Sequence, residues 1–206
     1  MAKELLTGSN VKTGTVIGFP HGNSAKTIKL LEADKACDDG ADEVDMVINV
    51  GKALGGDWDY VEDEINAINK AVVGKGAILK VIFENDFLES EHIIRLCQIC
   101  NHCGVAFVKT SSGYGFVKQD NGMYSYDGAT EQDLKLMRQH TDSTIEVKAA
   151  GGVRTLKDLL KVRSIGATRV GATATAAMLE EAKSVLASGE SLEDYLDSNS
   201  TLGSGN

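Results

Sequence analysis

The chain has little of several features that mark special classes of protein. Its 206 residues contain a single proline, and no stretch approaches the roughly 20 apolar residues that a membrane-spanning helix needs. The N-terminus shows no signal-peptide pattern. Basic residues are in the minority, since 21 Lys and Arg stand against 30 Asp and Glu, for a net charge of −9. This balance disfavours nucleic acid and anionic membranes as partners, and we expect a globular protein of the cytoplasm.

Cysteine is also scarce, and its positions allow two interpretations. A zinc site could combine Cys97 and Cys100 with His92 or His102. The same spacing fits the buried stripe of one helix, in which a free cysteine packs as a small hydrophobic residue. That stripe would consist of Ile93, Leu96, Cys97 and Cys100. We favour the packing interpretation and expect no metal.

Two kinds of segment alternate along the rest of the chain. Short apolar runs rich in β-branched residues predict buried strands, namely Thr13–Phe19, Glu43–Asn49, Ile78–Phe83, Val105–Thr110, Thr144–Ala149 and Arg169–Gly171. Helical periodicity predicts helices between them, namely Thr27–Asp39, Tyr60–Val72, Ser90–Cys103, Thr130–His140, Leu156–Ile165 and Thr175–Leu186. We expect Ser90 and Thr155 to cap their helices, and Ile28, Leu31 and Ala36 to share the buried side of theirs. Strand and helix in strict alternation predict a parallel α/β sheet or barrel.

Lysine occurs inside three of the predicted strands, where a charge must be paired or serve a function. Lys109 ends an otherwise apolar strand, and burial there would lower its pKa and leave an amine able to attack a carbonyl. Lys148 occupies the matching place on the next strand, and Lys80 lies inside an earlier one. Salt bridges alone could explain such lysines, but three on successive strands favour catalysis.

Asp45 is an acidic residue inside the strand Glu43–Asn49 and needs a partner. An ion pair with Lys80 or Lys148 would satisfy its buried charge and nothing more. Alternatively, Asp45 and Lys148 would move protons while Lys109 holds the substrate covalently.

Two glycine-containing turns follow the last two predicted strands. Gly151 and Gly152 precede Val153 and Arg154, and the final strand runs through Gly171 toward Thr173. Such turns let backbone N–H groups approach an anion at a helix N-terminus, and barrel enzymes commonly bind phosphate after their last two strands. Ordinary tight turns between strand and helix would show the same residues.

These motifs together resemble the deoxyribose-phosphate aldolases. The resemblance extends from about Ala2 to Leu179 and rests on five segments in the right order, namely Thr15–Gly22, Glu43–Gly51, Phe107–Gly113, Val147–Thr155 and Arg169–Ala174. It implies a TIM (β/α)8-barrel type of α/β fold. It also implies reversible cleavage of 2-deoxy-D-ribose 5-phosphate to D-glyceraldehyde 3-phosphate and acetaldehyde, with no metal or cofactor.

The resemblance also assigns residues to roles. Lys109 would form the Schiff base, Lys148 would perturb it and aid proton transfer, and Asp45 would serve the proton relay. The phosphate group would contact Gly113, Gly151, Gly152, Arg154, Gly171 and Thr173. We add Lys80 to the substrate-binding residues.

Three departures from the family pattern stand out. The first two strand-helix units are lacking, so six predicted strands stand where a closed barrel has eight; another subunit could cover the gap, the barrel could be rearranged, or the product could be truncated and unstable. The last loop reads Thr173-Ala174 in place of two small hydroxyl residues. The Tyr114–Asp127 segment is longer than usual and would lie over the active site or between subunits.

We therefore expect one domain over residues 1–197, followed by a disordered tail over 198–206. An aldolase that binds a small sugar phosphate and forms a homo-oligomer is the leading hypothesis. A non-catalytic, sugar-phosphate-binding remnant and a different imine-forming lyase are the alternatives.

Overall fold

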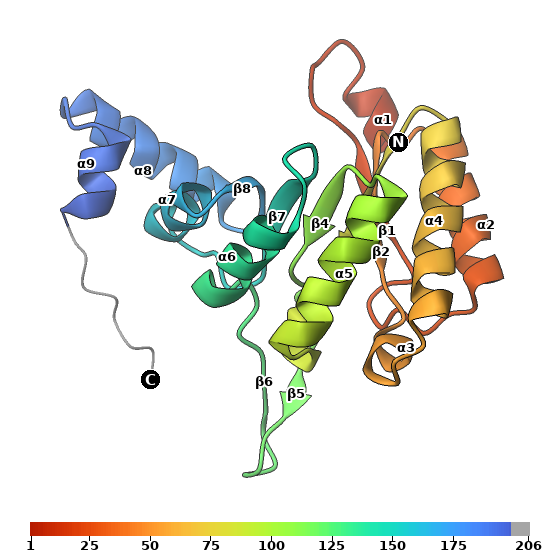
Figure 1. Ribbon diagram of the computed structural model, residues 1–206. Coiled ribbons are helices and arrows are strands. Elements are labelled where there is room, and N and C mark those ends of the chain that lie inside the picture. Colours follow the sequence, from red (N-terminus) through yellow and green to blue (C-terminus); the bar gives the residue numbers. More distant parts are fainter. Residues whose placement is uncertain (199–206) are drawn as a thin grey trace.

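A computed structural model describes residues 1–198 and places a six-stranded parallel sheet at the centre, in the order β1-β2-β3-β4-β7-β8 (Figure 1). The strands are β1 (Gly14–Ile17), β2 (Glu43–Val47), β3 (Ile78–Ile82), β4 (Phe107–Lys109), β7 (Glu146–Ala150) and β8 (Ala167–Gly171). The helices are α1 (Ala2–Leu5), α2 (Lys26–Asp38), α3 (Val50–Leu54), α4 (Trp58–Gly74), α5 (Ser90–Cys103), α6 (Glu131–His140), α7 (Leu156–Ser164), α8 (Thr175–Ala187) and α9 (Leu192–Asp197). A 3-10 turn (Asn85–Phe87) and a small antiparallel hairpin of β5 (Val117–Lys118) and β6 (Tyr124–Ser125) complete the set.

The predicted alternation of strand and helix is confirmed. Helix α5 has the predicted bounds, and the other five predicted helices differ from the structure by at most two residues at an end. Sequence patterns missed the short α3 and α9 and the β5–β6 hairpin. Apart from Ser198, the predicted disordered tail lies outside the described residues.

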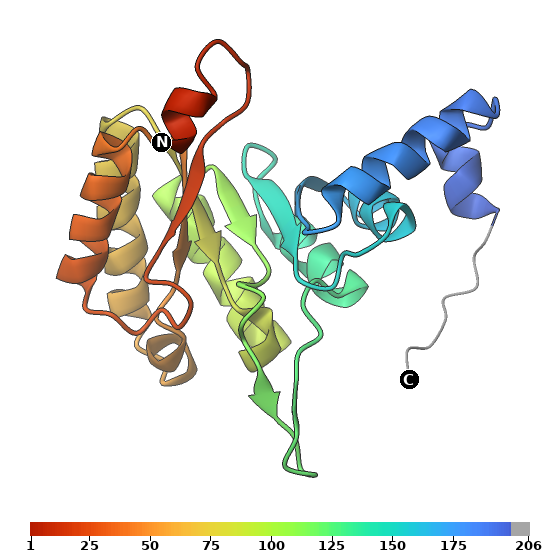
Figure 2. The ribbon, with the colours of Figure 1, turned by 180° about the vertical axis from the view of Figure 1, so that it is seen from behind.

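The sheet is curled but open, so the fold is part of a β/α barrel. Strands β1 and β8 form its two edges. Figure 2 shows strands β1 to β4 in front of α4 and α5, which cover the other face of the sheet. Apolar side chains are exposed near both edges: Val16 of β1 is 42% exposed and Leu179 of α8 is 57% exposed.

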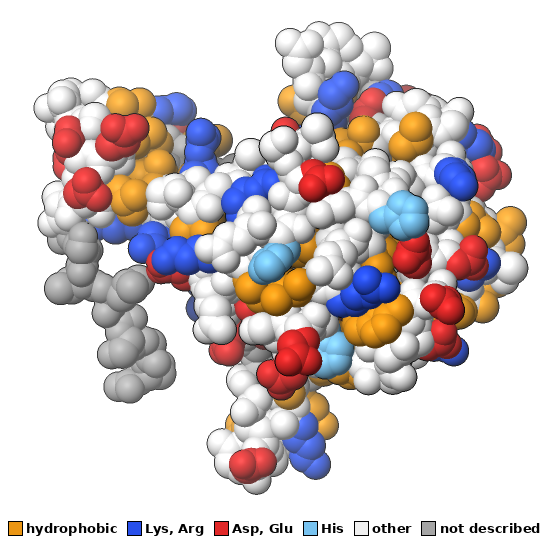
Figure 3. All heavy atoms as spheres, in the orientation of Figure 1, with side chains coloured by type: hydrophobic (Ala, Val, Ile, Leu, Met, Phe, Trp, Pro, Cys, Tyr) orange, Lys and Arg blue, Asp and Glu red, His pale blue; other side chains and the backbone are white. Residues whose placement is uncertain are grey.

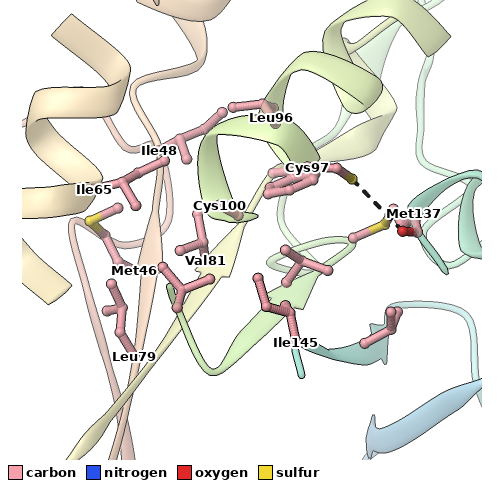
Figure 4. Close-up of a cluster of buried hydrophobic side chains, with 14 of the residues drawn as sticks. Met46, Ile48, Ile65, Leu79, Val81, Leu96, Cys97, Cys100, Met137 and Ile145 are labelled. Carbon is pink, nitrogen blue, oxygen red and sulfur yellow. Dashed lines mark hydrogen bonds between the residues drawn. The ribbon is translucent and has the colours of Figure 1, made fainter. Parts of the chain in front are cut away.

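The hydrophobic core lies between the convex face of the sheet and the helices (Figure 4). Alternate residues of each strand point into this layer, because successive side chains of a strand face opposite sides. Met46 of β2, Leu79 and Val81 of β3 and Ile65 of α4 meet there, all fully buried. Each such side chain stabilises the fold by about 1.5–3 kcal/mol relative to exposure, which fixes the helices against the strands.

Helix α5 confirms the packing interpretation of the cysteines. Cys97 and Cys100 lie in the core together with Ile93 and Leu96, and the Cys97 thiol donates to the Met137 carbonyl (Figure 4). Burial raises the pKa of Cys97 to about 12, so its thiol stays protonated. His102, a ligand in the zinc interpretation, pairs with Glu62.

Two local predictions were wrong. Helix α2 buries Lys29 and Ala33, whereas Ile28 and Leu31 are exposed. The buried face of α2 holds a charge because the Lys29 ammonium pairs with the Glu64 carboxylate of α4 at 2.9 Å, and both side chains are fully buried.

The other concerns the start of α5. Glu89 caps this helix, in a capping box with His92, and Ser90 is its first helical residue. Thr155 caps α7 as predicted.

Among the described residues, no helix is both long and apolar enough to cross a membrane.

Candidate active site

The concave face of the sheet carries charged side chains, at positions where buried strands of proteins usually have apolar ones. Asp45 of β2 lies beside Lys80 of β3, and Lys109 of β4 lies beside Lys148 of β7 in the sheet register. All four point to the side opposite the helices, because the apolar residues between them fill the core. The pleat therefore collects one carboxylate and three ammonium groups in one place.

Asp45 is the centre of this group. Its Oδ1 accepts a hydrogen bond from Lys80 Nζ at 2.8 Å, and its Oδ2 accepts from Lys109 Nζ at 2.9 Å and Lys148 Nζ at 2.7 Å. Strand β3 separates β2 from β4, and β7 is further still. Only the curl of the sheet lets one carboxylate reach lysines on three strands.

The surroundings set the protonation of these groups. Burial opposes ionisation of Asp45, but Lys109 and Lys148 outweigh it and hold the pKa of its carboxyl well below the usual value. Burial lowers the pKa of Lys109, and the nearby Lys148 ammonium adds to this effect against the attraction of Asp45. Lys109 is thus a buried amine, 6% exposed, that loses its proton more readily than a free lysine.

A second layer of charge lies deeper in the concave face. The Lys80 ammonium also pairs with Glu43 at 2.7 Å, and Glu43 in turn pairs with Arg169 of β8 at 2.7 Å. Lys80 is 1% exposed and has both carboxylates as partners, which disfavours the substrate contact predicted for it. Sequence patterns missed Arg169, whose position opposite Glu43 depends on the curl.

The turn after β7 has the backbone shape expected of an anion loop. Gly151 and Gly152 have φ values of 86° and 80°, a region that favours glycine. Gly128, which the sequence patterns did not single out, packs so closely that a Cβ on it would lie 2.7 Å from the Gly151 carbonyl carbon. The Ser111 hydroxyl is buried beside Gly151 and has no hydrogen-bond partner among the described residues.

The two helix N-termini near this turn differ. In α7, Thr155 caps the helix, and the Asp158 carboxylate accepts the N–H groups of Arg154 and Thr155 at 3.0 and 2.9 Å. Within residues 1–198, no side chain caps helix α8 at Ala174, so its first N–H groups remain available to an anion. An anion that bound at the glycine turns could therefore accept N–H groups at the start of α8, whereas side chains already accept those at the start of α7.

The remaining predicted phosphate residues surround the same end of the sheet. Gly113 follows β4 with a φ of 87°, and Gly171 ends β8, where a Cβ would lie 3.7 Å from Lys148 Cε. Thr173 is exposed just before α8, and the Arg154 side chain is exposed just before α7.

The predicted Tyr114–Asp127 segment divides into two parts. Tyr114 packs edge to face on Phe19 of the loop after β1, with ring centroids 5.5 Å apart, and so spans the carboxyl ends of the strands between them. The hairpin β5–β6 stands out from the body of the molecule (Figures 1 and 3). The segment thus both crosses the strand ends and projects outward.

Comparison with known proteins matches this geometry. The profile of the DeoC/LacD family aldolases matches residues 1–181. A Rhodopirellula baltica protein named deoxyribose-phosphate aldolase is 49% identical over 181 residues, covering 88% of this chain and 71% of the relative. A Treponema denticola protein of the same name is 41% identical over 179 residues, covering 87% and 78%.

Solved structures give the same answer. The aldolase QR15 superposes with a TM-score of 0.79 at 31% identity, covering 89% of this chain and 78% of that one. A tetrameric deoxyribose phosphate aldolase from Aeropyrum pernix has a TM-score of 0.74 at 27% identity, covering 89% and 72%. Fold, sequence and charged strand residues agree, and the chain belongs to the DeoC/LacD family of aldolases.

Proposed function

We propose that this chain is a deoxyribose-phosphate aldolase that cleaves 2-deoxy-D-ribose 5-phosphate to D-glyceraldehyde 3-phosphate and acetaldehyde. Its relatives of 41–49% identity carry this name, which favours the catalytic hypothesis over a non-catalytic remnant. The observation that carries the proposal is the convergence of Lys109, Lys148 and Lys80 on Asp45 inside the curled sheet.

Lys109 is the proposed nucleophile. Its lowered pKa provides a neutral amine, which adds to the substrate aldehyde and loses water to give an imine. The protonated imine draws electrons from the neighbouring carbon–carbon bond. Removal of the proton from the C3 hydroxyl then breaks the C2–C3 bond, which releases glyceraldehyde 3-phosphate and leaves an enamine. Protonation of the enamine and hydrolysis release acetaldehyde and the amine, so the reaction as proposed requires no metal or cofactor.

Asp45 and Lys148 are the proposed proton carriers. The Nζ atoms of Lys109 and Lys148 both donate a hydrogen bond to Asp45 Oδ2, so these two nitrogens are no further apart than the sum of the two hydrogen-bond distances. A proton can therefore pass between them along hydrogen bonds that already exist. Because the pKa of Asp45 is lowered, its carboxylate holds a transferred proton only briefly and stays ionised between transfers, when it orients the two amines.

The substrate phosphate is proposed to bind at Gly113, Gly151, Gly152 and Gly171, with Thr173 and Arg154 at the rim. The first three have positive φ values, a conformation in which successive backbone N–H groups can form a concave binding surface for an anion. The uncapped N-terminus of α8 adds a favourable dipole. Local cations and amides of this kind can hold a dianion although the chain has a net charge of −9.

We further propose that residues 1–197 act as a single domain, in the cytoplasm, within a homo-oligomer. The apolar side chains at both edges of the sheet support the oligomer, since exposed apolar surface commonly marks an interface.

Borohydride trapping tests the proposal. With acetaldehyde and borohydride, the protein should gain one ethyl group in place of an amine hydrogen, and peptide mapping should place it on Lys109. Lys109→Ala should abolish both the adduct and retro-aldol turnover, whereas Lys135→Ala, at an exposed lysine of α6, should leave both unchanged. A folded protein that forms no adduct would refute the proposal.

A further inference from the structure

Glu84 has an unusual backbone for its residue type. It follows β3 with φ 63° and ψ 61°, and among residues 1–198 it is the one non-glycine residue with a positive φ. This left-handed region is strained for a side chain without the short amide of Asn or the freedom of Gly. Such strain persists only where the surroundings enforce it, and it clusters at functional sites.

The side chain of Glu84 explains what the strained backbone achieves. One carboxylate oxygen accepts the Ser112 N–H at 3.0 Å, and the Ser112 hydroxyl accepts the Tyr114 N–H at 3.0 Å. On the other side, Gly115 lies so close that a Cβ on it would be 2.6 Å from the same carboxylate oxygen. The turn over residues 112–115 is thus wrapped around the carboxyl group of Glu84, with Gly113 inside the turn.

This turn is the direct continuation of the strand that carries Lys109. The backbone on either side of Glu84 is bonded to the same strand, since Phe83 N–H donates to the Lys109 carbonyl and Asn85 N–H donates to the Thr110 carbonyl. Glu84 is 2% exposed, so its carboxyl is part of the support beneath the turn rather than a surface group. Burial raises the pKa of the Glu84 carboxyl, against the hydrogen bond from Ser112.

We propose that Glu84 is a positioning residue for phosphate recognition: its carboxyl group holds the 112–115 turn so that the Gly113 N–H faces the substrate phosphate. This inference rests on the proposed function, because it concerns the phosphate of the same substrate. Glu84 acts through the turn and touches no reacting atom. Its loss should therefore weaken binding of phosphorylated ligands and spare the chemistry at Lys109.

Three variants separate this role from general stabilisation. Glu84→Ala removes the acceptor of the Ser112 N–H. Glu84→Gln keeps an acceptor oxygen on a side chain of the same shape and mimics the neutral acid. Val72→Ala, on the buried face of α4 near its C-terminal end, loses a buried apolar group outside the turn and controls for lower stability. Each variant is assayed for KM and kcat with deoxyribose 5-phosphate, for borohydride trapping of acetaldehyde, and for affinity for inorganic phosphate.

In Glu84→Ala we expect KM and the Kd for phosphate to rise about tenfold, with kcat and acetaldehyde trapping within about twofold of wild type. Glu84→Gln and Val72→Ala should stay within about threefold of wild type in every assay. If Glu84→Ala does not fold, Gly115→Ala takes its place. Its Cβ must displace either the Glu84 carboxyl or the turn, and either shift separates the two and should cause the same selective rise in KM.

An unchanged KM, or a parallel loss of acetaldehyde trapping, would overturn the proposal. The absence of any adduct in the wild-type protein would instead refute the aldolase function. In that case the phosphate affinity of Glu84→Ala still decides the role of Glu84.

Discussion

Replacement of Lys148 by Met should raise the pKa of Lys109. In the native protein the Lys148 ammonium lies next to Lys109 and shares the same Asp45 oxygen. Lys148→Met removes a repelling charge and leaves Asp45 free to pair more fully with Lys109, and both effects favour the protonated amine. At an effective dielectric constant of about 20 and a separation of about 5 Å, two unit charges repel by about 3 kcal/mol, equivalent to about 2 pKa units. The Lys148 side chain is 16% exposed, so solvent screening reduces the expected shift to about 1 to 2 units.

The pH dependence of acetaldehyde trapping measures this shift. The neutral amine is the reactive form, so the trapping rate rises with pH through the pKa of Lys109 and then levels off. Because that pKa is lowered from 10.5, the wild-type midpoint should lie below 10.5, and Lys148→Met should move it toward that value. The midpoint is read independently of the plateau rate, which falls as well because Lys148 is a proposed proton carrier.

Two control variants make the result specific. Lys148→Arg keeps the positive charge and should move the midpoint by less than about 0.5 units, whereas Lys135→Met, on the exposed face of α6, should not move it. A midpoint that stays in place or falls in Lys148→Met would refute the electrostatic account of Lys109.

Four further results are expected. Asp45→Asn leaves three ammonium groups without their shared partner and should lower the free energy of unfolding in urea by about 3–5 kcal/mol; no change would mean that the charges are solvated. Because the pKa of Asp45 is lowered from 3.8 in the folded protein, below pH 3.8 the unfolded chain binds a proton at Asp45 more readily than the folded protein does. The stability of the wild type should therefore decrease as the pH drops below 3.8. The dependence of stability on pH in this range should be weaker in Asp45→Asn. Lys29→Met leaves the buried Glu64 carboxylate without its partner and should lower the free energy of unfolding by about 3–5 kcal/mol. The double variant Lys29→Met with Glu64→Leu should recover most of that loss. Equal losses in the single and double variants would contradict the ion pair. Gly128→Ala should raise KM for the phosphorylated substrate about tenfold by displacing Gly151, whereas an unchanged KM would show that the loop does not depend on this contact.

Much of the secondary structure and of the candidate site could be predicted from the sequence, because both depend on the local properties of side chains. Apolar runs and helical periodicity gave the six strands and six of the helices, because burial of one face imposes a period on each element. The candidate site was readable for the same reason, since Lys109, Lys148 and Asp45 interrupt apolar strands where a charge is costly. Thr155 marked the start of α7 because a hydroxyl caps the first free N–H groups.

Tertiary structure decided what no local pattern encodes. Helix α2 buries Lys29 rather than Ile28, because Glu64, far along the chain, supplies a buried partner. Glu84 carries no sequence signal, since its role depends on a turn that closes around it. The sequence determined which side chains would be buried and charged, since side-chain period and the cost of desolvation act within each strand. The curl of the sheet determined that Asp45 meets three lysines at once, because that contact spans strands distant in the chain and exists only when all of them are packed.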